Sequence, residues 1–111
     1  AAAAAAAADV VAEAHRIIDA AKAGRWGDVY KALDRRRELV NVRPDVREYA
    51  VLHQAAFYGS AAAASRLLDD YGADPRQATK SGLGAGDVAA ERGHAALAER
   101  LRERAAAAAG R

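Results

Sequence analysis

The residues of this chain that could do chemistry are three histidines, three serines and a pair of adjacent aspartates. A zinc site would need His or carboxylate ligands at a spacing such as H-x-x-x-H or H-E-x-x-H, and His15, His53 and His94 have no such neighbours. Asp69 and Asp70 are adjacent at a predicted helix end, so their side chains point to different sides. No serine lies in a G-x-S-x-G turn. The sequence therefore predicts no catalytic residue, no metal and no cofactor, and the protein is not expected to be an enzyme.

Residues 82–87 read G-L-G-A-G-D, which superficially resembles a phosphate-binding loop. Such a loop needs a strand before it and either a Lys-Ser/Thr pair or a completed G-x-G-x-x-G after it. None of these is present, so the segment is interpreted as a turn that enters a helix.

Composition excludes further classes of protein. The chain has 111 residues, the length of one small domain, and 34 of them are alanine. Cysteine is absent, which excludes disulfides and thiol chemistry and fits an intracellular, cytoplasmic location. A helix that spans a membrane needs about 18 or more strongly apolar residues in a row, and the sequence has no such stretch. With 17 basic and 15 acidic residues, the net charge of +2 gives little attraction for nucleic acid.

The elements that would position a binding surface are indicated by an internal repeat. Two alanines, two other residues and a glycine recur as A-A-K-A-G at 20–24, A-A-F-Y-G at 55–59 and A-A-E-R-G at 89–93. Apolar residues follow each glycine at helical spacing, and glycine suits the end of a helix because that position needs a positive φ. Each unit is therefore predicted to be a helix, a glycine turn and a second helix. The alanines would let neighbouring copies stack closely.

The two ends are of low complexity. Residues 1–8 are all alanine, and residues 105–111 form an alanine-rich tail. Each run could extend a neighbouring helix, or it could stand in for residues that were not identified. The folded domain is expected to cover residues 9–104, with units at about 12–43, 44–77 and 78–104.

The middle unit has the most specific sequence. It reads V-L-H-Q-A-A-F-Y-G at 51–59, then Leu67-Leu68, then Gly72-Ala73-Asp74. This resembles the ankyrin repeat, whose usual motif is T-P-L-H-x-A-A, then G-H, L-L and G-A-D-V-N with a period near 33. Residues 17–41 resemble an opening repeat of that family and residues 82–94 a closing one.

The departures from the family pattern affect the ends of the array. Ala50 and Val51 replace the Thr-Pro of the middle repeat, and the last repeat has Gly84 and Gly86 at its helix start. A glycine in a helix costs roughly 0.5–1 kcal/mol relative to alanine. The first inter-repeat loop, residues 43–49, is longer than usual and lacks the usual glycine. We therefore expect an unusual first finger and a loose last repeat.

The resemblance implies an all-α, ankyrin-type stack of three helix–turn–helix repeats with short β-hairpin-like fingers. It also implies that His53 and His94 have structural roles and that the protein is a non-catalytic, scaffold-like module. Such a module would bind a protein partner, and no small-molecule substrate, through its concave helix face and fingers. The expected contact residues are Arg43, Asp45, Arg47 and Tyr49 on the first finger, Phe57 and Tyr58 on the middle helix, Lys80 and Leu83 on the second finger, and Glu91 and Arg92 on the last unit.

Several alternatives stay open at this point. Phe57 or Tyr58 could cover the thin alanine core instead of contacting a partner, whereas Trp26, Tyr30 and Tyr71 are expected to pack between helices. The arginines at 35–37 are interpreted as a solvated helix C-terminus, with an acidic partner as the alternative. The chain could also be a structural part of a large multiprotein assembly, as its alanine runs and lack of methionine suggest, or the targeting domain of a larger enzyme. Nucleic-acid binding through arginines would predict an affinity that falls steeply with salt.

Overall fold

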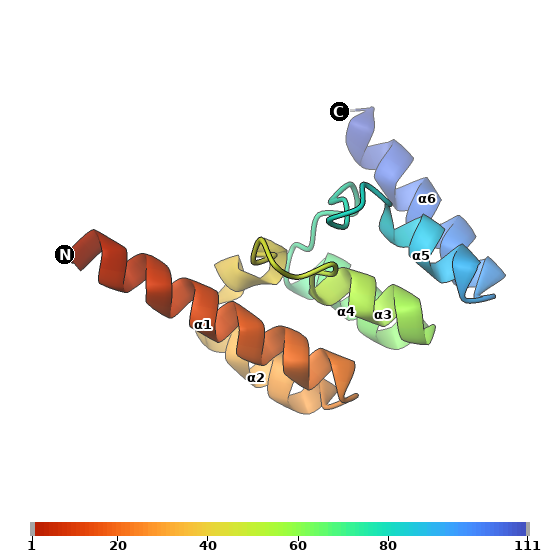
Figure 1. Cartoon of the computed structure of the whole chain (residues 1–111). Coiled ribbons are helices and arrows are strands. Elements are labelled where there is room, and N and C mark those ends of the chain that lie inside the picture. Colours follow the sequence, from red (N-terminus) through yellow and green to blue (C-terminus); the bar gives the residue numbers. More distant parts are fainter. Residues whose placement is uncertain (1, 111) are drawn as a thin grey trace.

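The computed structural model describes residues 2–110, and the burial of side chains from residue 7 onward. This part of the chain is helical and contains no strand, which confirms the predicted all-α class. The elements are, in chain order (Figure 1), α1 (Ala2–Lys22), α2 (Trp26–Arg35), the 3-10 helix η1 (Arg37–Asn41), α3 (Val51–Tyr58), α4 (Ala61–Asp70), α5 (Ala85–Glu91) and α6 (Ala95–Ala109).

The three predicted glycine turns are present, and each joins the two helices of a pair. The φ angle is +77° at Gly24, +71° at Gly59 and +82° at Gly93. In each turn the N–H of the residue after the glycine donates to the carbonyl of the first alanine of the repeated motif. These bonds run from Arg25 to Ala20 at 2.8 Å, from Ser60 to Ala55 at 3.0 Å and from His94 to Ala89 at 2.9 Å. This bond closes a Schellman cap and needs a left-handed residue before it. The repeated motif therefore builds the same turn three times.

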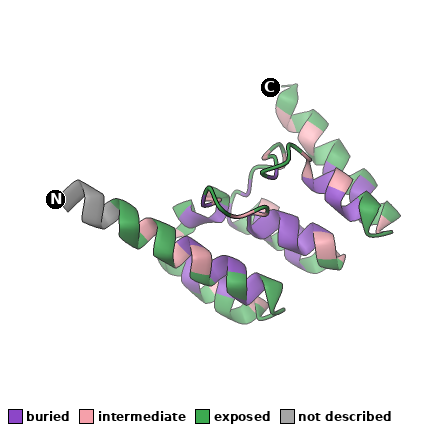
Figure 2. Cartoon of the chain, in the orientation of Figure 1, coloured by how far each residue is buried: buried purple, intermediate pink, exposed green. Residues whose placement is uncertain are grey.

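The helix pairs pack side by side in two layers. α3 contacts both α1 and α5 in the first layer, and α2, α4 and α6 lie behind their partners in the second (Figure 1). The motif alanines Ala21, Ala55, Ala56 and Ala89 are fully buried, as the purple stretches of Figure 2 show, so the helix backbones can approach closely. The same core contains buried leucines from both layers and from η1: Leu33, Leu39, Leu52, Leu67, Leu97 and Leu101.

Aromatic side chains support the second layer. Tyr71 is buried and its ring is parallel to that of Tyr30, with centroids 5.9 Å apart. The Tyr71 hydroxyl donates to an Asp34 carboxylate oxygen at 2.7 Å, and the Arg66 guanidinium lies 4.0 Å from the Tyr30 ring centroid. Trp26 stacks on the other aromatic residue of α2, Tyr30, with ring centroids 6.3 Å apart, and both are partly buried against the core. The structure thus packs Trp26, Tyr30 and Tyr71 as the sequence predicts.

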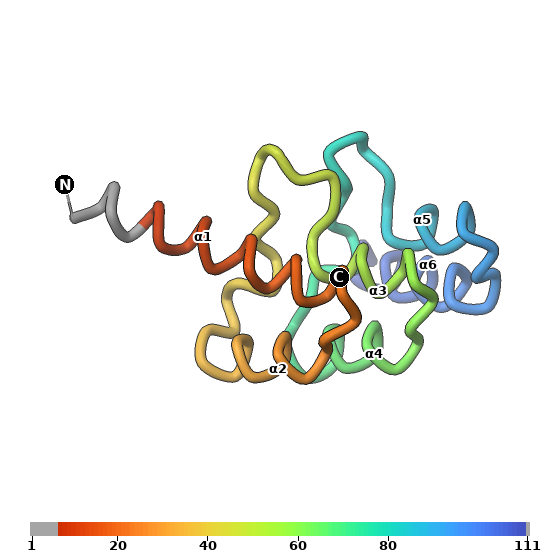
Figure 3. The backbone as a smooth tube through the Cα atoms, turned by 60° about the horizontal axis from the view of Figure 1, so that its bottom comes forward, coloured from red at the N-terminus to blue at the C-terminus, as the bar shows by residue number. Residues whose placement is uncertain are grey.

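Two loops project together from the same end of the helices (Figure 3). The first finger, residues 43–49, is joined to the second finger, residues 76–83, through Glu48. Its carbonyl accepts from the Lys80 N–H at 2.9 Å, and its carboxylate accepts from the Ser81 N–H at 3.0 Å and hydroxyl at 2.9 Å. Neither finger forms a strand, so the hairpin-like geometry implied by the resemblance is not confirmed within residues 2–110.

The last helix pair uses its glycines for close packing. Gly86 is buried under α6, and a Cβ added there would lie 3.1 Å from the Ala98 carbonyl oxygen. The start of α5 is held by Asp87, whose carboxylate accepts from the Gly84 N–H at 3.1 Å and from Arg102 at 2.9 Å. The sequence predicted only the conformational cost of these glycines. In the structure Gly86 lets α5 and α6 approach.

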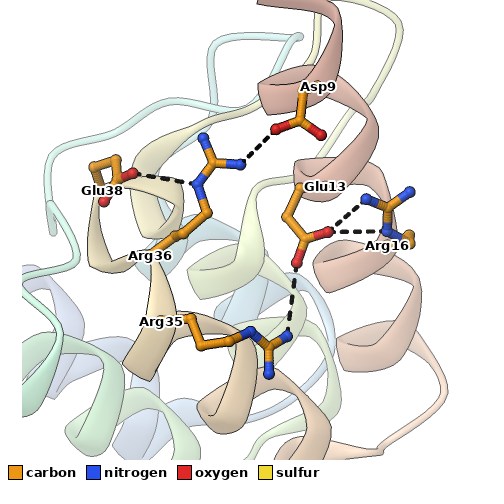
Figure 4. A network of polar contacts seen from close by, with 6 residues as sticks. All are labelled: Asp9, Glu13, Arg16, Arg35, Arg36 and Glu38. Atoms are coloured by element: carbon orange, nitrogen blue, oxygen red, sulfur yellow. Dashed lines mark hydrogen bonds and ion pairs between the residues drawn. The ribbon is translucent and has the colours of Figure 1, made fainter. Parts of the chain in front are cut away.

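The arginine run at 35–37 is bonded to neighbouring helices (Figure 4). Arg36 pairs with Asp9 of α1 at 2.9 Å, and Arg35 lies 4.0 Å from Glu13, which also pairs with Arg16. Arg37 donates to the main-chain carbonyl of α4 at residue 70. The interpretation of this run as a solvated helix end is therefore incomplete. Exposed ion pairs of this kind contribute only about 0–1 kcal/mol each to stability. Here the arginines bond to residues that are 22 or more positions away in sequence.

Both alanine runs are helical where the structure describes them. α1 begins at Ala2 and α6 continues to Ala109, so the alanines extend the adjoining helices as one interpretation of the sequence predicts.

Candidate binding surface

Two cavities lie on the face that α1 and α3 share with the first finger. The finger cavity has a volume of about 320 Å³ and is lined by Lys22, Val46, Arg47, Glu48, Tyr49, Gln54, Phe57 and Tyr58. The turn cavity, also about 320 Å³, lies at the glycine turn after α1 and is lined by Lys22, Ala23, Gly24, Trp26 and Tyr58. Because Lys22 and Tyr58 line both cavities, the two are adjacent. We call them together the groove.

Aromatic rings form one wall of the groove. The Phe57 ring centroid lies 5.8 Å from that of Tyr49 and 5.0 Å from that of Tyr58, with an edge-to-face arrangement in the second pair. The Arg92 guanidinium lies over the Phe57 ring, 4.2 Å from its centroid. Tyr58 and the finger residue Val46 are 49% and 77% exposed, so large apolar side chains border the groove on both sides.

Arg47 lies in the finger cavity but its charge is already paired. Its guanidinium donates to His15 Nδ1 at 2.9 Å and pairs with the Asp19 carboxylate on α1. The Arg47 side chain is 22% exposed, so these bonds hold the first finger against α1. The neighbouring Glu48 faces the second finger, and the hydrogen bonds from Ser81 lower the pKa of its carboxyl below the usual range. Neither charge is available to pair with a bound molecule.

His53 is the fully buried link between α3 and the second finger. Its Nδ1 accepts from the Ala50 N–H at 3.0 Å, which satisfies a backbone donor at the start of α3. Nε2 therefore carries the proton and donates to the Gln77 carbonyl at 2.9 Å. Burial lowers the pKa of the imidazole from its ordinary value of 6.5, because a charged ring would be desolvated. His53 thus joins the start of α3 to the second finger.

We expect the free energy of unfolding to fall as the pH is lowered below 6.5. The native state holds His53 neutral, so between its lowered pKa and 6.5 the unfolded chain binds more protons and is favoured. Urea unfolding at pH values on either side of 6.5 measures this slope. In His53→Gln the slope should disappear, and a slope equal to that of the wild type would assign it to another group. Protonation of Glu48 and Asp87 also lowers the free energy of unfolding, but only at lower pH, because the pKa values of these carboxyls lie below their ordinary values of 4.5 and 3.8.

His94 links the last unit to the middle one. It stands at the start of α6, and its Nε2 lies 3.1 Å from the Phe57 carbonyl at the end of α3. Its ring also covers Gly59, where an added Cβ would lie 2.5 Å from Nδ1. Both His53 and His94 are thus bonded to the main chain, which is the kind of role that the resemblance implies.

The structure brings together five of the ten residues expected to contact a partner. Arg47, Tyr49, Phe57 and Tyr58 line the finger cavity, and Arg92 covers Phe57. Glu91 is exposed beside them on α5. Burial raises the pKa of the Tyr49 phenol, and the negative charges of Glu48 and Glu91 raise it further.

The remaining predicted residues lie elsewhere. Arg43 and Asp45 line a different cavity of about 390 Å³ that also includes Val11 of α1. Arg43 is bonded to the Arg47 carbonyl at 2.7 Å. Lys80 is exposed on the second finger, and Leu83 is half-buried and packs against the core. These four residues do not line the groove.

The groove also has residues that were not among the predicted contact residues: Lys22, Ala23, Gly24, Trp26, Val46, Glu48 and Gln54. Lys22 occupies, in the first unit, the position that Phe57 holds in the second, so aligning the repeats could have identified it. Val46 gave only the weaker signal of an apolar residue in a predicted loop. Gln54 carries no signal in the sequence, because its place in the cavity depends on how the first finger folds over α3.

The arrangement offers surface and shape rather than reactive groups. Among the described residues, no three His, Asp or Glu side chains converge as a metal site would require. No helix in the same part of the chain combines the length and the apolar character needed to cross a membrane. Comparison of the chain with protein-family models, curated proteins and solved structures gives no significant match. The function must therefore be argued from the groove itself.

Proposed function

We propose that this chain is a non-catalytic, ankyrin-type repeat module that binds a protein partner through the groove. The proposal is supported by three copies of one helix–turn–helix unit and by two loops that project on the same side. It depends most on one observation: Val46 and Tyr58 are large apolar side chains exposed at 77% and 49% on the rim of an aromatic-lined cavity.

Exposed apolar residues beside half-buried aromatics are the features that binding sites share. Tyrosine, tryptophan and arginine supply most of the energy at protein interfaces. Here Tyr49, Tyr58 and Trp26 line the groove, and Arg92 covers the Phe57 ring beside it. The groove is also held in place before binding. Arg47 fixes the first finger to α1 and Glu48 fixes it to the second finger, so little ordering cost is expected on association.

The test is capture of partners from a cell lysate by the tagged chain and by a groove variant. We expect Val46→Ser/Tyr58→Ser to reduce recovery of the specific partner about tenfold or more, because both side chains would be desolvated at the interface. Val11→Ser is the matched control, since Val11 is an exposed valine (42%) on α1 that lines neither cavity of the groove. Circular dichroism verifies that each variant is folded. Equal capture by the wild type and the groove variant would contradict the proposal.

A further inference from the structure

The groove contains one positive charge without a partner. Lys22 lies between the two cavities, and no carboxylate of the described residues is within 4.0 Å of its amine. Arg47 is paired with Asp19, whereas Glu48 keeps its negative charge but directs its carboxylate to Ser81 of the second finger. At the rim, Glu91 and Arg92 are adjacent in sequence and of opposite sign. A ligand group that pairs with Lys22 therefore carries a negative charge.

The groove also contains a polar side chain that is free to bind a ligand. Gln54 is only 6% exposed as a residue and lines the finger cavity, and no hydrogen bond joins its side-chain amide to another described residue. Its amide atoms are not among the buried side-chain atoms that lack a partner, so they reach the solvent of the cavity, where they offer both a donor and an acceptor. A peptide main chain presents the same pair of groups. Gln54 is thus placed to bind the backbone of a segment that enters the finger cavity.

The dimensions of the groove favour an extended segment. It follows α3, whose eight residues span about 12 Å. In an extended chain, residues i, i+2 and i+4 face the same side and cover about 13 Å. An α-helix about 10 Å wide would need an open channel, whereas Tyr58 stands between the two cavities.

We propose that the groove binds an extended peptide segment of the pattern apolar-x-acidic-x-apolar. The first apolar side chain enters the finger cavity beside Phe57, and the second enters the turn cavity beside Trp26. The central carboxylate pairs with Lys22, and the main chain bonds to the Gln54 amide. This rests on the proposed function, because it specifies the chemistry of the partner at the same site.

A fluorescein-labelled peptide, Gly-Ser-Leu-Ser-Asp-Ser-Leu-Ser-Gly, tests the pattern by fluorescence anisotropy with the full chain. Two comparison peptides have Lys in place of Asp, or Ser in place of both Leu. We expect Lys22→Glu to weaken binding of the acidic peptide about tenfold and to strengthen binding of the lysine peptide by a similar factor. The control is Lys31→Glu, the same change at an exposed lysine of α2 outside the groove, with less than about a twofold effect.

Gln54→Leu, which keeps the volume of the side chain, separates the main-chain contact from the charge. We expect it to weaken binding of the acidic and lysine peptides by a similar factor and to leave their order unchanged. Binding that is lost when Ser replaces both leucines confirms that the cavities take apolar side chains.

The proposal is overturned if the acidic peptide shows no saturable binding up to about 1 mM, or if Lys22→Glu leaves its affinity unchanged. It is also overturned if Tyr58→Ser abolishes self-association of the chain in sedimentation, because a second copy would then occupy the groove. If no peptide binds while Val46→Ser/Tyr58→Ser still loses its lysate partner, the proposed function stands. In that case the partner presents a folded surface to the groove instead of an extended segment.

Discussion

Replacing His53 by alanine should lower the free energy of unfolding by about 3–5 kcal/mol, the range that truncation of a large buried ring produces. The ring is 0% exposed, so its removal leaves a cavity. It also leaves the Ala50 N–H and the Gln77 carbonyl without their partner, and unsatisfied buried groups of this kind are costly. Urea unfolding followed by circular dichroism at pH 7 measures the loss.

His53→Asn separates the two bonds of the imidazole. The Asn carbonyl oxygen can reach the position of Nδ1 and accept from Ala50, but it cannot reach Gln77. We expect it to recover part of the stability lost in His53→Ala. His15→Ala serves as the control, because this ring is partly exposed and should cost about 1 kcal/mol or less. A loss below about 1 kcal/mol for His53→Ala would show that the second finger is held by other contacts.

Replacing Gly59 by alanine should cost about 3 kcal/mol, more than the same change at Gly24. Both glycines have a left-handed backbone, with φ of +71° and +77°, so each substitution should cost about 1–2 kcal/mol from backbone strain alone. Only at Gly59 does the new Cβ meet a neighbour, the His94 ring at 2.5 Å, whereas nothing lies within 4 Å of a Cβ at Gly24. The ring must move and lose its bond to the Phe57 carbonyl.

A double-mutant cycle isolates this contact. In the His94→Ala background the cost of Gly59→Ala should fall to that of Gly24→Ala, because the space above the glycine is then free. Chemical denaturation of the four variants gives the coupling free energy directly. Equal costs at Gly24 and Gly59 in the wild-type background would show that the last helix pair does not depend on the contact between His94 and Gly59.

The sequence was sufficient to predict the repeated turns because they depend on local chemistry. A glycine after A-A-x-x must adopt a positive φ to end the helix, and the spacing of Gly24, Gly59 and Gly93 places one such turn in each unit. The alternation of helices and turns follows from the same motif. Gly86 was less predictable: locally it weakens a helix, and only the neighbouring helix shows why a side chain would not fit there.

The groove was predicted in part for a similar reason. Phe57 and Tyr58 follow from their place in the repeat, but the direction of the first finger does not. Arg43 and Arg47 are four residues apart in one loop, yet only Arg47 lines the groove, because His15 and Asp19 of the previous unit hold its guanidinium. Partners 28 to 32 residues away decide where such side chains go, and loop sequence carries little information about them.

The bonds that join one helix pair to the next have a further consequence for how the chain folds. Within residues 2–110 no hydrogen bond spans more than the 41 residues between Tyr30 and Tyr71, and the bond that the Ser81 hydroxyl donates to Glu48 spans 33. Contacts of such moderate sequence separation require only short loops to close, so little entropy is lost before a contact forms. Folding can therefore start at any adjacent pair of units and extend outward to the ends. The middle unit, which contacts both neighbours, should be the last to open once the chain has folded.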